Sequence, residues 1–326
     1  MTILIVSDYL APYEGNFIYS IKKLCEKMLK DKNQVIFVFP YEAENISWVQ
    51  DLSKEYPIIF GVKLKKMLKI IASNGINVIY THFYLPKTQC IVKLSSRVLR
   101  VPLVQHWHNH YQKGKGAKGM LANWGFEGDF NIACSKSVAD SLPYASSKKT
   151  YINNAIDFIR LDEYDKNFSF TEDKKQKVIL MFGFDYERKG VDLAVLALKQ
   201  IVLNRNIKLV ISLSKNHKHV YSKIVKQCGY FPKWIEIVDA RNDVATYYNA
   251  ADIFLSAARE EGFCYSLIEA AYCGCNLISS EIEGVPYKNI PFCKTFESEN
   301  IEDLKQRILE SIDDFDINKK QQTKKR

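Results

Sequence analysis

The chain has 326 residues, of which 47% are hydrophobic and 13% aromatic, and a formal net charge of +9. This length and composition favour a globular protein with room for two domains and exclude a fibrous or largely disordered one. No apolar run approaches the roughly 18 residues of a membrane span, and residues 1–7 lack the basic start and long apolar stretch of a signal peptide. We therefore expect a cytoplasmic protein.

The eight cysteines are scattered without a CxxC pair, and Cys134 and Cys264, like most of them, lie in apolar strand or helix patterns. We expect reduced, structural cysteines. Cys273 and Cys275 are too close for an easy disulfide and lack neighbouring histidines, so we expect no zinc site there.

The net positive charge of the chain comes entirely from the first half. Residues 1–150 contain 20 Lys and Arg against 11 Asp and Glu, whereas residues 151–326 contain 26 of each. Much of the excess falls in an amphipathic stretch at 61–71 and a Gly- and Lys-rich stretch at 112–119. We expect this half to bind an anionic membrane surface at the inner face of the plasma membrane; a solvated helix face plus a loop is the alternative. No recognised motif supports a nucleic acid partner.

The hydrophobic period alternates between strand and helix along the first half. Strands are predicted at residues 3–7, 34–39, 77–81, 102–106 and 130–133, and helices at 17–29, 61–71, 88–99 and after residue 135. This alternation predicts βαβ units around a parallel sheet.

The same rhythm restarts in the second half. Strands are predicted at residues 177–182, 207–213, 234–238, 253–255 and 276–279, and helices at 191–203 and 265–272. The polar stretch 162–175 reads as a linker. We predict an α/β protein with two Rossmann-like, doubly wound domains, residues 1–160 and residues 161–326, the second ending in a basic tail at 318–326.

A basic turn follows the first strand of the second domain. It spans residues 183–190, carries Arg188 and Lys189, and opens a helix. A lysine at such a turn neutralises phosphate, and an arginine beside it can bind two oxygens at once.

Two acids lie farther along the same domain. Glu261 precedes the predicted helix 265–272, and Glu269 lies about two turns inside it. Ligands of open α/β sheets bind at the carboxyl ends of strands, beside helix N-termini. A cation for phosphates, N–H groups for charge and an acid for sugar hydroxyls describe a nucleotide-sugar site; two surface acids on an ordinary helix are the alternative.

These motifs together resemble the retaining glycosyltransferases of the GT-B fold, family 4. The resemblance rests on Glu-x7-Glu at 261–269, the Lys-Gly turn at 189–190, Asn-Asn-Ala-Ile-Asp at 153–157 and Gly-Asn-Phe at 15–17, and it spans residues 3 to about 286. It implies two Rossmann-like domains facing a cleft, with the nucleotide-sugar held mainly by the second and the acceptor mainly by the first.

The resemblance assigns donor-binding roles in the second domain. Lys189 would contact the diphosphate, Glu269 the ribose hydroxyls and Glu261 the hydroxyls of the transferred sugar. The backbone N–H groups of Phe263 and Cys264 would serve the same donor. Arg241 and Asn242 lie where such enzymes place the nucleobase, although a plain loop is equally compatible with their sequence.

The first domain would complete the site. Gly15 would let its loop approach the phosphates, and His108 would face the donor sugar. His82 matches a histidine that follows the preceding strand. We expect His106 to point to the face opposite His108 and leave it out of the site, and we expect Trp107 to be a core residue.

Two positions depart from the family pattern. Phe184 stands where an arginine directly follows the glycine of the diphosphate turn, so Arg188 is expected to substitute for it, and Glu14 replaces the first of two paired glycines. The expected mechanism needs no metal or other cofactor, because Lys189, Arg188 and the helix N-terminus would stabilise the departing diphosphate. The acceptor would attack from the same face, with a diphosphate oxygen taking its proton.

The resemblance thus implies a retaining glycosyltransferase. It would move a hexosyl or N-acetylhexosaminyl group from a UDP-sugar to a glycan or lipid-linked acceptor in bacterial cell-surface polysaccharide biosynthesis. The alternatives are a non-catalytic glycosyltransferase-like partner subunit and a sugar-nucleotide epimerase.

Overall fold

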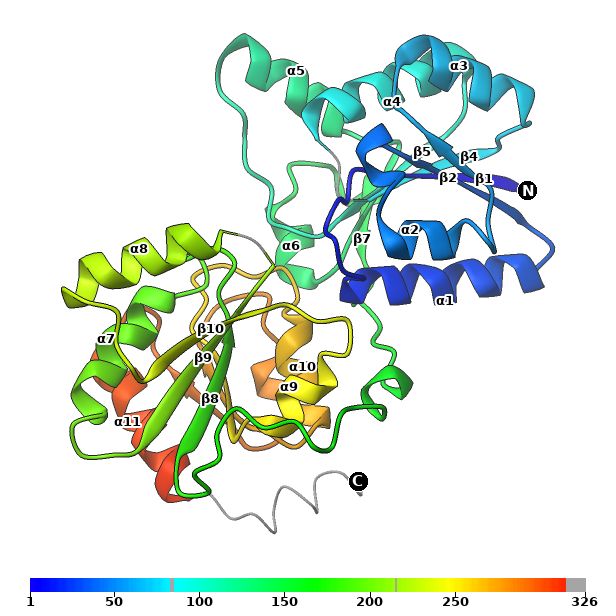
Figure 1. Cartoon of the computed structure of the whole chain (residues 1–326). Coiled ribbons are helices and arrows are strands. Elements are labelled where there is room, and N and C mark those ends of the chain that lie inside the picture. Colours follow the sequence, from blue (N-terminus) through cyan, green and yellow to red (C-terminus); the bar gives the residue numbers. More distant parts are fainter. Residues whose placement is uncertain (83–84, 215, 315–326) are drawn as a thin grey trace. The chain divides into compact units, whose positions relative to one another are not determined.

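Figure 1 shows a computed structural model of the chain, which describes residues 1–82, 85–214 and 216–314. The chain divides into two compact units, Met1–Ala155 and Ile156–Arg326. Each unit contains one parallel sheet with helices on both faces. The basic tail predicted at 318–326 lies outside the described residues.

The sheet of the first unit has the strand order β3-β2-β1-β4-β5-β6-β7, and every pair is parallel. Helices α1 and α2 cover one face, and α3, α4 and α5 the other (Figure 1). The strands are β1 Thr2–Ser7, β2 Gln34–Phe39, β3 Ile58–Phe60, β4 Val78–His82, β5 Leu103–Trp107, β6 Phe130–Ala133 and β7 Lys149–Tyr151. The α-helices are α1 Asn16–Lys30, α2 Ser47–Leu52, α3 Leu64–Ser73, α4 Pro86–Leu99, α5 Gly116–Phe126 and α6 Lys136–Ser141. Short 3₁₀ turns are η1 Tyr41–Ala43 and η2 Ser146–Lys148.

The sheet of the second unit has the order β10-β9-β8-β11-β12-β13, again all parallel. Helices α7, α8 and α11 lie on one face, and α9 and α10 on the other (Figure 1). The strands are β8 Lys177–Phe182, β9 Ile207–Leu213, β10 Ile235–Asp239, β11 Ile253–Ser256, β12 Asn276–Ser280 and β13 Cys293–Phe296. The helices are α7 Val191–Ile201, α8 His217–Cys228, α9 Ala245–Ala250, α10 Tyr265–Tyr272 and α11 Ile301–Asp313, with η3 Ile159–Leu161 and η4 Tyr287–Asn289.

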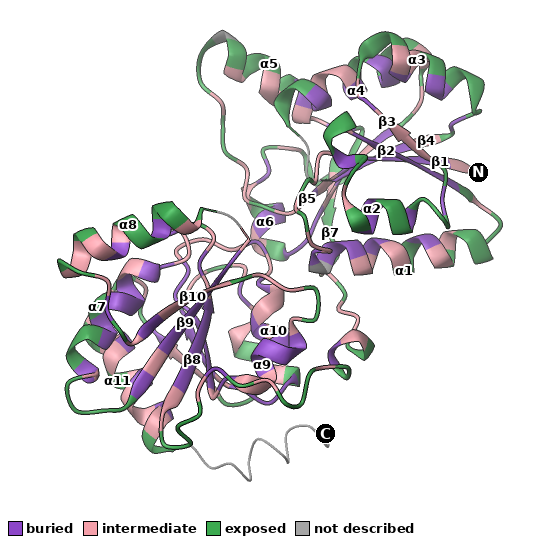
Figure 2. Ribbon diagram, in the orientation of Figure 1, coloured by how far each residue is buried: buried purple, intermediate pink, exposed green. Residues whose placement is uncertain are grey.

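The central strands are buried on both faces, as Figure 2 shows. Continuous apolar runs such as 3–6 and 178–181 are therefore required, because helices cover both sides of a parallel sheet. In each sheet the strand order reverses direction, between β1 and β4 and between β8 and β11. Such a switch point is where doubly wound proteins bind ligands, at the carboxyl ends of the strands.

No helix is predicted at 112–119, but residues 116–126 form α5. Glycine is a poor helix former, so tertiary packing decides this element. Gly125 lets α5 lie close to α4: a Cβ there would meet Cys90 Sγ at 2.8 Å. The Cys90 thiol also donates to the Leu121 carbonyl at 3.4 Å.

The stretch predicted as a linker, 162–175, belongs to the second unit. Phe170 is buried in the core formed by α9, α10 and the sheet, and Phe168 packs against the same core. The Lys208 ammonium group donates to the Phe170 carbonyl oxygen at 2.6 Å. Phe168 and Phe170 therefore anchor this polar stretch to the second unit. The polarity of the stretch as a whole favoured a linker instead.

Candidate functional site

Two loops meet at the switch point of the second sheet. The loop 183–190 joins β8 to α7, the loop 257–264 joins β11 to α10, and β8 pairs with β11. Gly190 has a φ of +65°, and a Cβ there would collide with the Ala257 carbonyl oxygen. The Arg259 N–H donates to the Arg188 carbonyl at 2.8 Å. Glycine is therefore needed at position 190 both for the backbone conformation and for the close approach of the two loops.

These loops bring Lys189 and Glu261 together. The Lys189 ammonium pairs with a Glu261 carboxylate oxygen, and each side chain is 11% exposed. The Lys189 Nζ lies 4.8 Å and the Arg188 guanidinium carbon 5.1 Å from the centre of the Phe184 ring. Phe184, where the family pattern has an arginine, is thus an aromatic surface for two cations.

The N-terminus of α10 lies beside this ion pair. Cys264, the residue before the helix, has a φ of +53° and is buried, and the half-buried Phe263 ring packs against Tyr265 with ring centres 5.1 Å apart. The Cys264 side chain makes no capping hydrogen bond to α10. Burial raises the pKa of the Cys264 thiol, which stays protonated. The N–H groups at a helix N-terminus can bind an anion.

Glu269 is on α10 as predicted, but its carboxylate is fully buried. It forms an ion pair with Arg160, from η3, and accepts a hydrogen bond from the Tyr248 hydroxyl at 3.1 Å. Burial, with the neighbouring Glu269, holds the pKa of the Tyr248 phenol well above its usual value, so this hydroxyl remains a donor. Both partners were missed by the sequence analysis, because Arg160 lies 109 residues from Glu269 and no periodic pattern connects them.

Arg241 follows β10 and is bound within its own loop. Its guanidinium makes two hydrogen bonds to Asp243, at 2.7 and 2.5 Å, and lies 5.2 Å from the Phe168 ring centre and 5.4 Å from that of Tyr247. Asn242 is exposed. Asp243 offsets part of the charge of Arg241, and the planar guanidinium group lies over the Phe168 and Tyr247 rings.

Arg259 was also missed and connects the two loops to α7. It binds both carboxylate oxygens of Asp192 at 2.8 and 2.7 Å and pairs with Glu299. It also donates to the Glu187 carbonyl within the loop 183–190. The carboxylates hold the pKa of the Arg259 guanidinium above its usual value. In the sequence, its position directly before Glu260 and Glu261 was the one indication that Arg259 belongs to this site.

In the first unit, Gly15 lies after β1 at the start of α1. A Cβ at this position would collide with the Tyr9 hydroxyl, and the neighbouring Glu14 forms an ion pair with Lys22. Gly15 therefore allows a close approach of Tyr9. Lys22 of α1 offsets the charge of Glu14, the residue that replaces the first of the two paired glycines.

Three histidines gather at the carboxyl ends of β4 and β5. His82 is opposite His106 in the strand register. The His82 Nδ1 and His108 Nε2 are 3.1 Å apart, and the rings of His106 and His108 stack with centres 4.5 Å apart. Burial lowers the pKa of His82 and His108 well below 6.5 and that of His106 to about 4, so all three rings are neutral at pH 7.

The prediction that His106 points away from His108 is wrong. Residues two apart along an extended chain lie on the same face, so both rings point the same way. His106 accordingly joins the cluster with His82 and His108. Trp107, between them, is buried and donates to the Asn131 side chain at 3.0 Å, as expected of a core residue.

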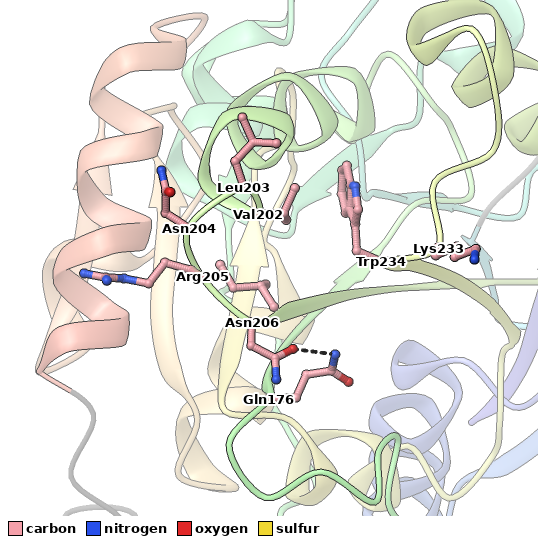
Figure 3. Close-up of a pocket in the computed structure, with 9 residues that line it drawn as sticks. Gln176, Val202, Leu203, Asn204, Arg205, Asn206, Lys233 and Trp234 are labelled. Atoms are coloured by element: carbon pink, nitrogen blue, oxygen red, sulfur yellow. Dashed lines mark hydrogen bonds between the residues drawn. The ribbon is translucent and has the colours of Figure 1, made fainter.

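A pocket of about 550 Å³ lies elsewhere in the second unit (Figure 3). Its lining includes Gln176, Ile207 and Trp234, which stand at the amino ends of β8, β9 and β10, and the Gln176 side chain donates to Asn206 at 2.9 Å. The predicted donor residues Lys189 and Glu261 follow the opposite, carboxyl ends of the strands. This pocket is therefore separate from the candidate site.

None of the described helices is long and apolar enough to cross a membrane.

The fold is shared with known proteins. Residues 162–326 match the glycosyl transferases group 1 family. An uncharacterized glycosyltransferase of Methanocaldococcus jannaschii, MJ1178, is 26% identical over 341 residues, which cover 98% of this chain and 90% of that protein. The lipopolysaccharide glucosyltransferase WaaG of Escherichia coli is 24% identical over 249 residues, covering 74% of this chain and 64% of WaaG. The structure of Anabaena HepE in complex with UDP superposes with a TM-score of 0.71 at 15% identity, covering 96% of this chain and 90% of HepE.

These likenesses and the two parallel sheets define a glycosyltransferase with the GT-B fold, which confirms the predicted fold class. More particularly, the chain belongs to the glycosyl transferases group 1 family, whose match covers half of its length.

Proposed function

We propose that this protein is a retaining glycosyltransferase of family 4 that moves a hexosyl or N-acetylhexosaminyl group from a UDP-sugar. The observation that carries the proposal is the largely buried ion pair of Lys189 and Glu261 beside the N-terminus of α10. It provides a cation and an acid beside the N–H groups of a helix N-terminus, at the switch point of the unit that matches the family. The UDP in the HepE complex supports the choice of nucleotide.

Binding of the donor rearranges this pair. Lys189, Arg188 and the N–H groups of Phe263 and Cys264 bind the diphosphate. Glu261 then releases Lys189 and accepts a hydrogen bond from a sugar hydroxyl. Cleavage of the sugar-phosphate bond moves negative charge onto the diphosphate, where these groups stabilise it. The step requires no metal, and the departing oxygen takes the proton of the acceptor hydroxyl on the same face of the sugar.

The remaining predicted residues orient the donor. His108 and the Gly15 loop belong to the first unit and contribute to the sugar and phosphate end. Glu269 accepts hydrogen bonds from the ribose hydroxyls once Arg160 moves away from it. Arg241 and Asn242 contact the base. The domain assignment of residues 1–160 to the acceptor and 161–326 to the donor belongs to the same proposal.

The acceptor is a glycan or a lipid-linked glycan of cell-surface polysaccharide biosynthesis, a proposal supported by the likeness to WaaG, whose name gives lipopolysaccharide as its target. The protein works in the cytoplasm, peripherally at an anionic membrane surface. The exposed apolar residues Met120, Leu121 and Trp124 of α5, next to Lys115 and Lys118, support this placement.

A donor screen tests the proposal. Purified protein is mixed with UDP-, GDP-, CDP- and dTDP-sugars, and thermal stabilisation and slow donor hydrolysis are measured. We expect stabilisation by UDP-sugars that Lys189→Ala and Glu261→Gln both weaken. Lys223→Ala is the matched control, because Lys223 forms an exposed pair with Glu187 on the same turn.

The outcomes separate the competing functions. Stabilisation with anomeric retention in the product supports the proposal. A donor altered at a sugar carbon without any acceptor would indicate an epimerase. No response to any nucleotide-sugar would indicate a non-catalytic partner subunit.

A further inference from the structure

The three histidines of the first unit are close enough to share one ion. Each offers a ring nitrogen, and these nitrogens lie within 4.8 Å of one another. Two nitrogens bound to the same tetrahedral zinc are about 3.3 Å apart, given bonds of about 2.0 Å. His82 Nδ1 and His108 Nε2 are hydrogen-bonded to each other at 3.1 Å, which is close to this spacing, and an ion bound to both would replace the hydrogen between them.

The fold holds the rings in place before any ligand arrives. His82 ends β4, His106 lies opposite it in β5, and His108 follows two residues later. His106 stacks on His108, with an angle of 10° between the ring planes, and Phe17 of α1 packs against His82 and His108 with ring centres 6.5 and 5.8 Å away. A prearranged set of ligands loses little conformational freedom when it binds.

Two of the ring nitrogens are buried without a partner. The Nε2 atoms of His82 and His106 have no hydrogen-bond partner among the described residues, and His82 is only 1% exposed. Buried polar atoms in folded proteins are almost always satisfied. An ion shared with His82 Nδ1 and His108 Nε2 would satisfy His106 Nε2. His82 Nε2 is directed away from such an ion, because one imidazole ring presents only one nitrogen to a metal.

Tyr80 supports the cluster from outside. Its hydroxyl lies 2.6 Å from His106 Nδ1. When Nδ1 donates its hydrogen to this oxygen, the lone pair of Nε2 is free for a ligand. Histidines that bind metals are commonly oriented by such an outer hydrogen bond.

We infer that His82, His106 and His108 form a binding site for a divalent transition-metal ion of the zinc class. Imidazole nitrogen suits zinc, copper and nickel, whereas magnesium and calcium select oxygen ligands. Three protein ligands leave a fourth position for water or another small ligand. The site lies in the first unit and uses neither Lys189 nor Glu261, and the diphosphate still leaves without a metal. It includes His108, which the proposed function assigns to the donor sugar, so its test uses no donor.

Zinc binding by the full-length protein tests the site. The protein is stripped with a chelator, dialysed, and titrated with Zn²⁺ in competition with a chromophoric chelator, without any sugar donor. We expect one equivalent to bind. His106→Asn should abolish this binding, and His219→Asn, which removes an exposed histidine of α8, should leave it intact.

Tyr80→Phe removes only the outer hydroxyl and should weaken zinc binding about 10- to 100-fold. Circular dichroism checks that each variant is folded. Zinc binding unchanged in folded His106→Asn, or no binding by the wild-type protein, would overturn the inference.

Cobalt gives a second readout on the unaltered protein, independent of any substitution. Co²⁺ held by three imidazoles has visible absorption bands without a thiolate charge-transfer band in the near ultraviolet. We expect this spectrum. A thiolate band would assign the metal to the free cysteines and reject the histidine site, and Mg²⁺ in excess should not displace the cobalt.

Discussion

Arg160 and Glu269 show how one distant contact changes the environment of a predicted site residue. Their side chains are 10% and 1% exposed. Removal of the cation from a buried pair costs about 3–5 kcal/mol, because the remaining charge is left unpaired. We expect Arg160→Ala to lower the free energy of unfolding by about this amount, as measured by urea denaturation.

The double variant Arg160→Met with Glu269→Gln separates stability from donor binding. It removes both charges and keeps a side-chain oxygen to accept from Tyr248, so we expect most of the stability to return while stabilisation by UDP-sugars stays weak. A loss below about 1 kcal/mol in Arg160→Ala would contradict the buried pair.

At the level of single residues, the sequence indicated Lys189 and Glu261, which the structure brings together across 72 residues. It also indicated His82 and His108 separately, and the strand register joins them with His106. Arg160, Tyr248 and Arg259 could not be found in this way. Their roles depend on which loops become neighbours, which is not encoded in any local spacing.

At the level of secondary structure elements, the turn before α7 depends on Gly190. Gly190→Ala adds a collision with the Ala257 carbonyl to the strain of a positive φ, whereas Gly229, with a φ of +84° after α8, has open space around it. We expect Gly229→Ala to cost about 1 kcal/mol and Gly190→Ala clearly more. Thermal melts of both variants, with and without UDP, measure this difference.

Replacement of glycine by alanine should affect UDP binding at position 190 but not at position 229. A displaced turn moves Lys189, so Gly190→Ala should reduce stabilisation by UDP and Gly229→Ala should not. Equal effects of the two variants on stability and on UDP binding would show that the close approach of the loops is unimportant.

Helices α3 and α5 differ as candidates for membrane contact. In α3 the exposed lysines lie over a buried apolar face, and Lys66 is bound to the Phe60 carbonyl. In α5 apolar side chains themselves are exposed, with Met120 at 67% and Leu121 at 57%. Apolar side chains that insert beside lysines bind a lipid surface more strongly than lysines alone.

We therefore expect Met120→Ser with Leu121→Ser to reduce sedimentation with anionic vesicles more than replacement of Lys63, Lys65 and Lys69 by Gln. Neutral vesicles serve as the control, because both contributions need anionic lipid for full strength. A larger loss in the α3 variant would place the contact on that helix instead.

At the level of the whole molecule, each unit has its own sheet and core. We expect residues 156–326 alone to unfold cooperatively and to be stabilised by UDP, without transferring sugar. Residues 1–155 alone should show no response to UDP. Calorimetry of the two fragments measures both, and an unfolded second fragment or a UDP response confined to the first would contradict this division of roles.

The sequence by itself determined the parallel α/β architecture. Strands at 34–39, 130–133, 177–182 and 207–213 and the helix at 265–272 have the predicted bounds, because their apolar runs must be buried on both faces or along one stripe. Short outer strands such as β3 and β13 and the glycine-rich α5 lack a strong local pattern, and neighbouring elements stabilise them.

Only the tertiary structure decided which side chains meet. Parallel pairing sets β8 beside β11 and β4 beside β5, and this places Lys189 against Glu261 and His82 against His106. It also buries Glu269 against Arg160. Local periodicity reports which face of an element is apolar, but the order of strands in a sheet depends on packing between residues far apart in the chain, and that order positions the chemistry of this protein.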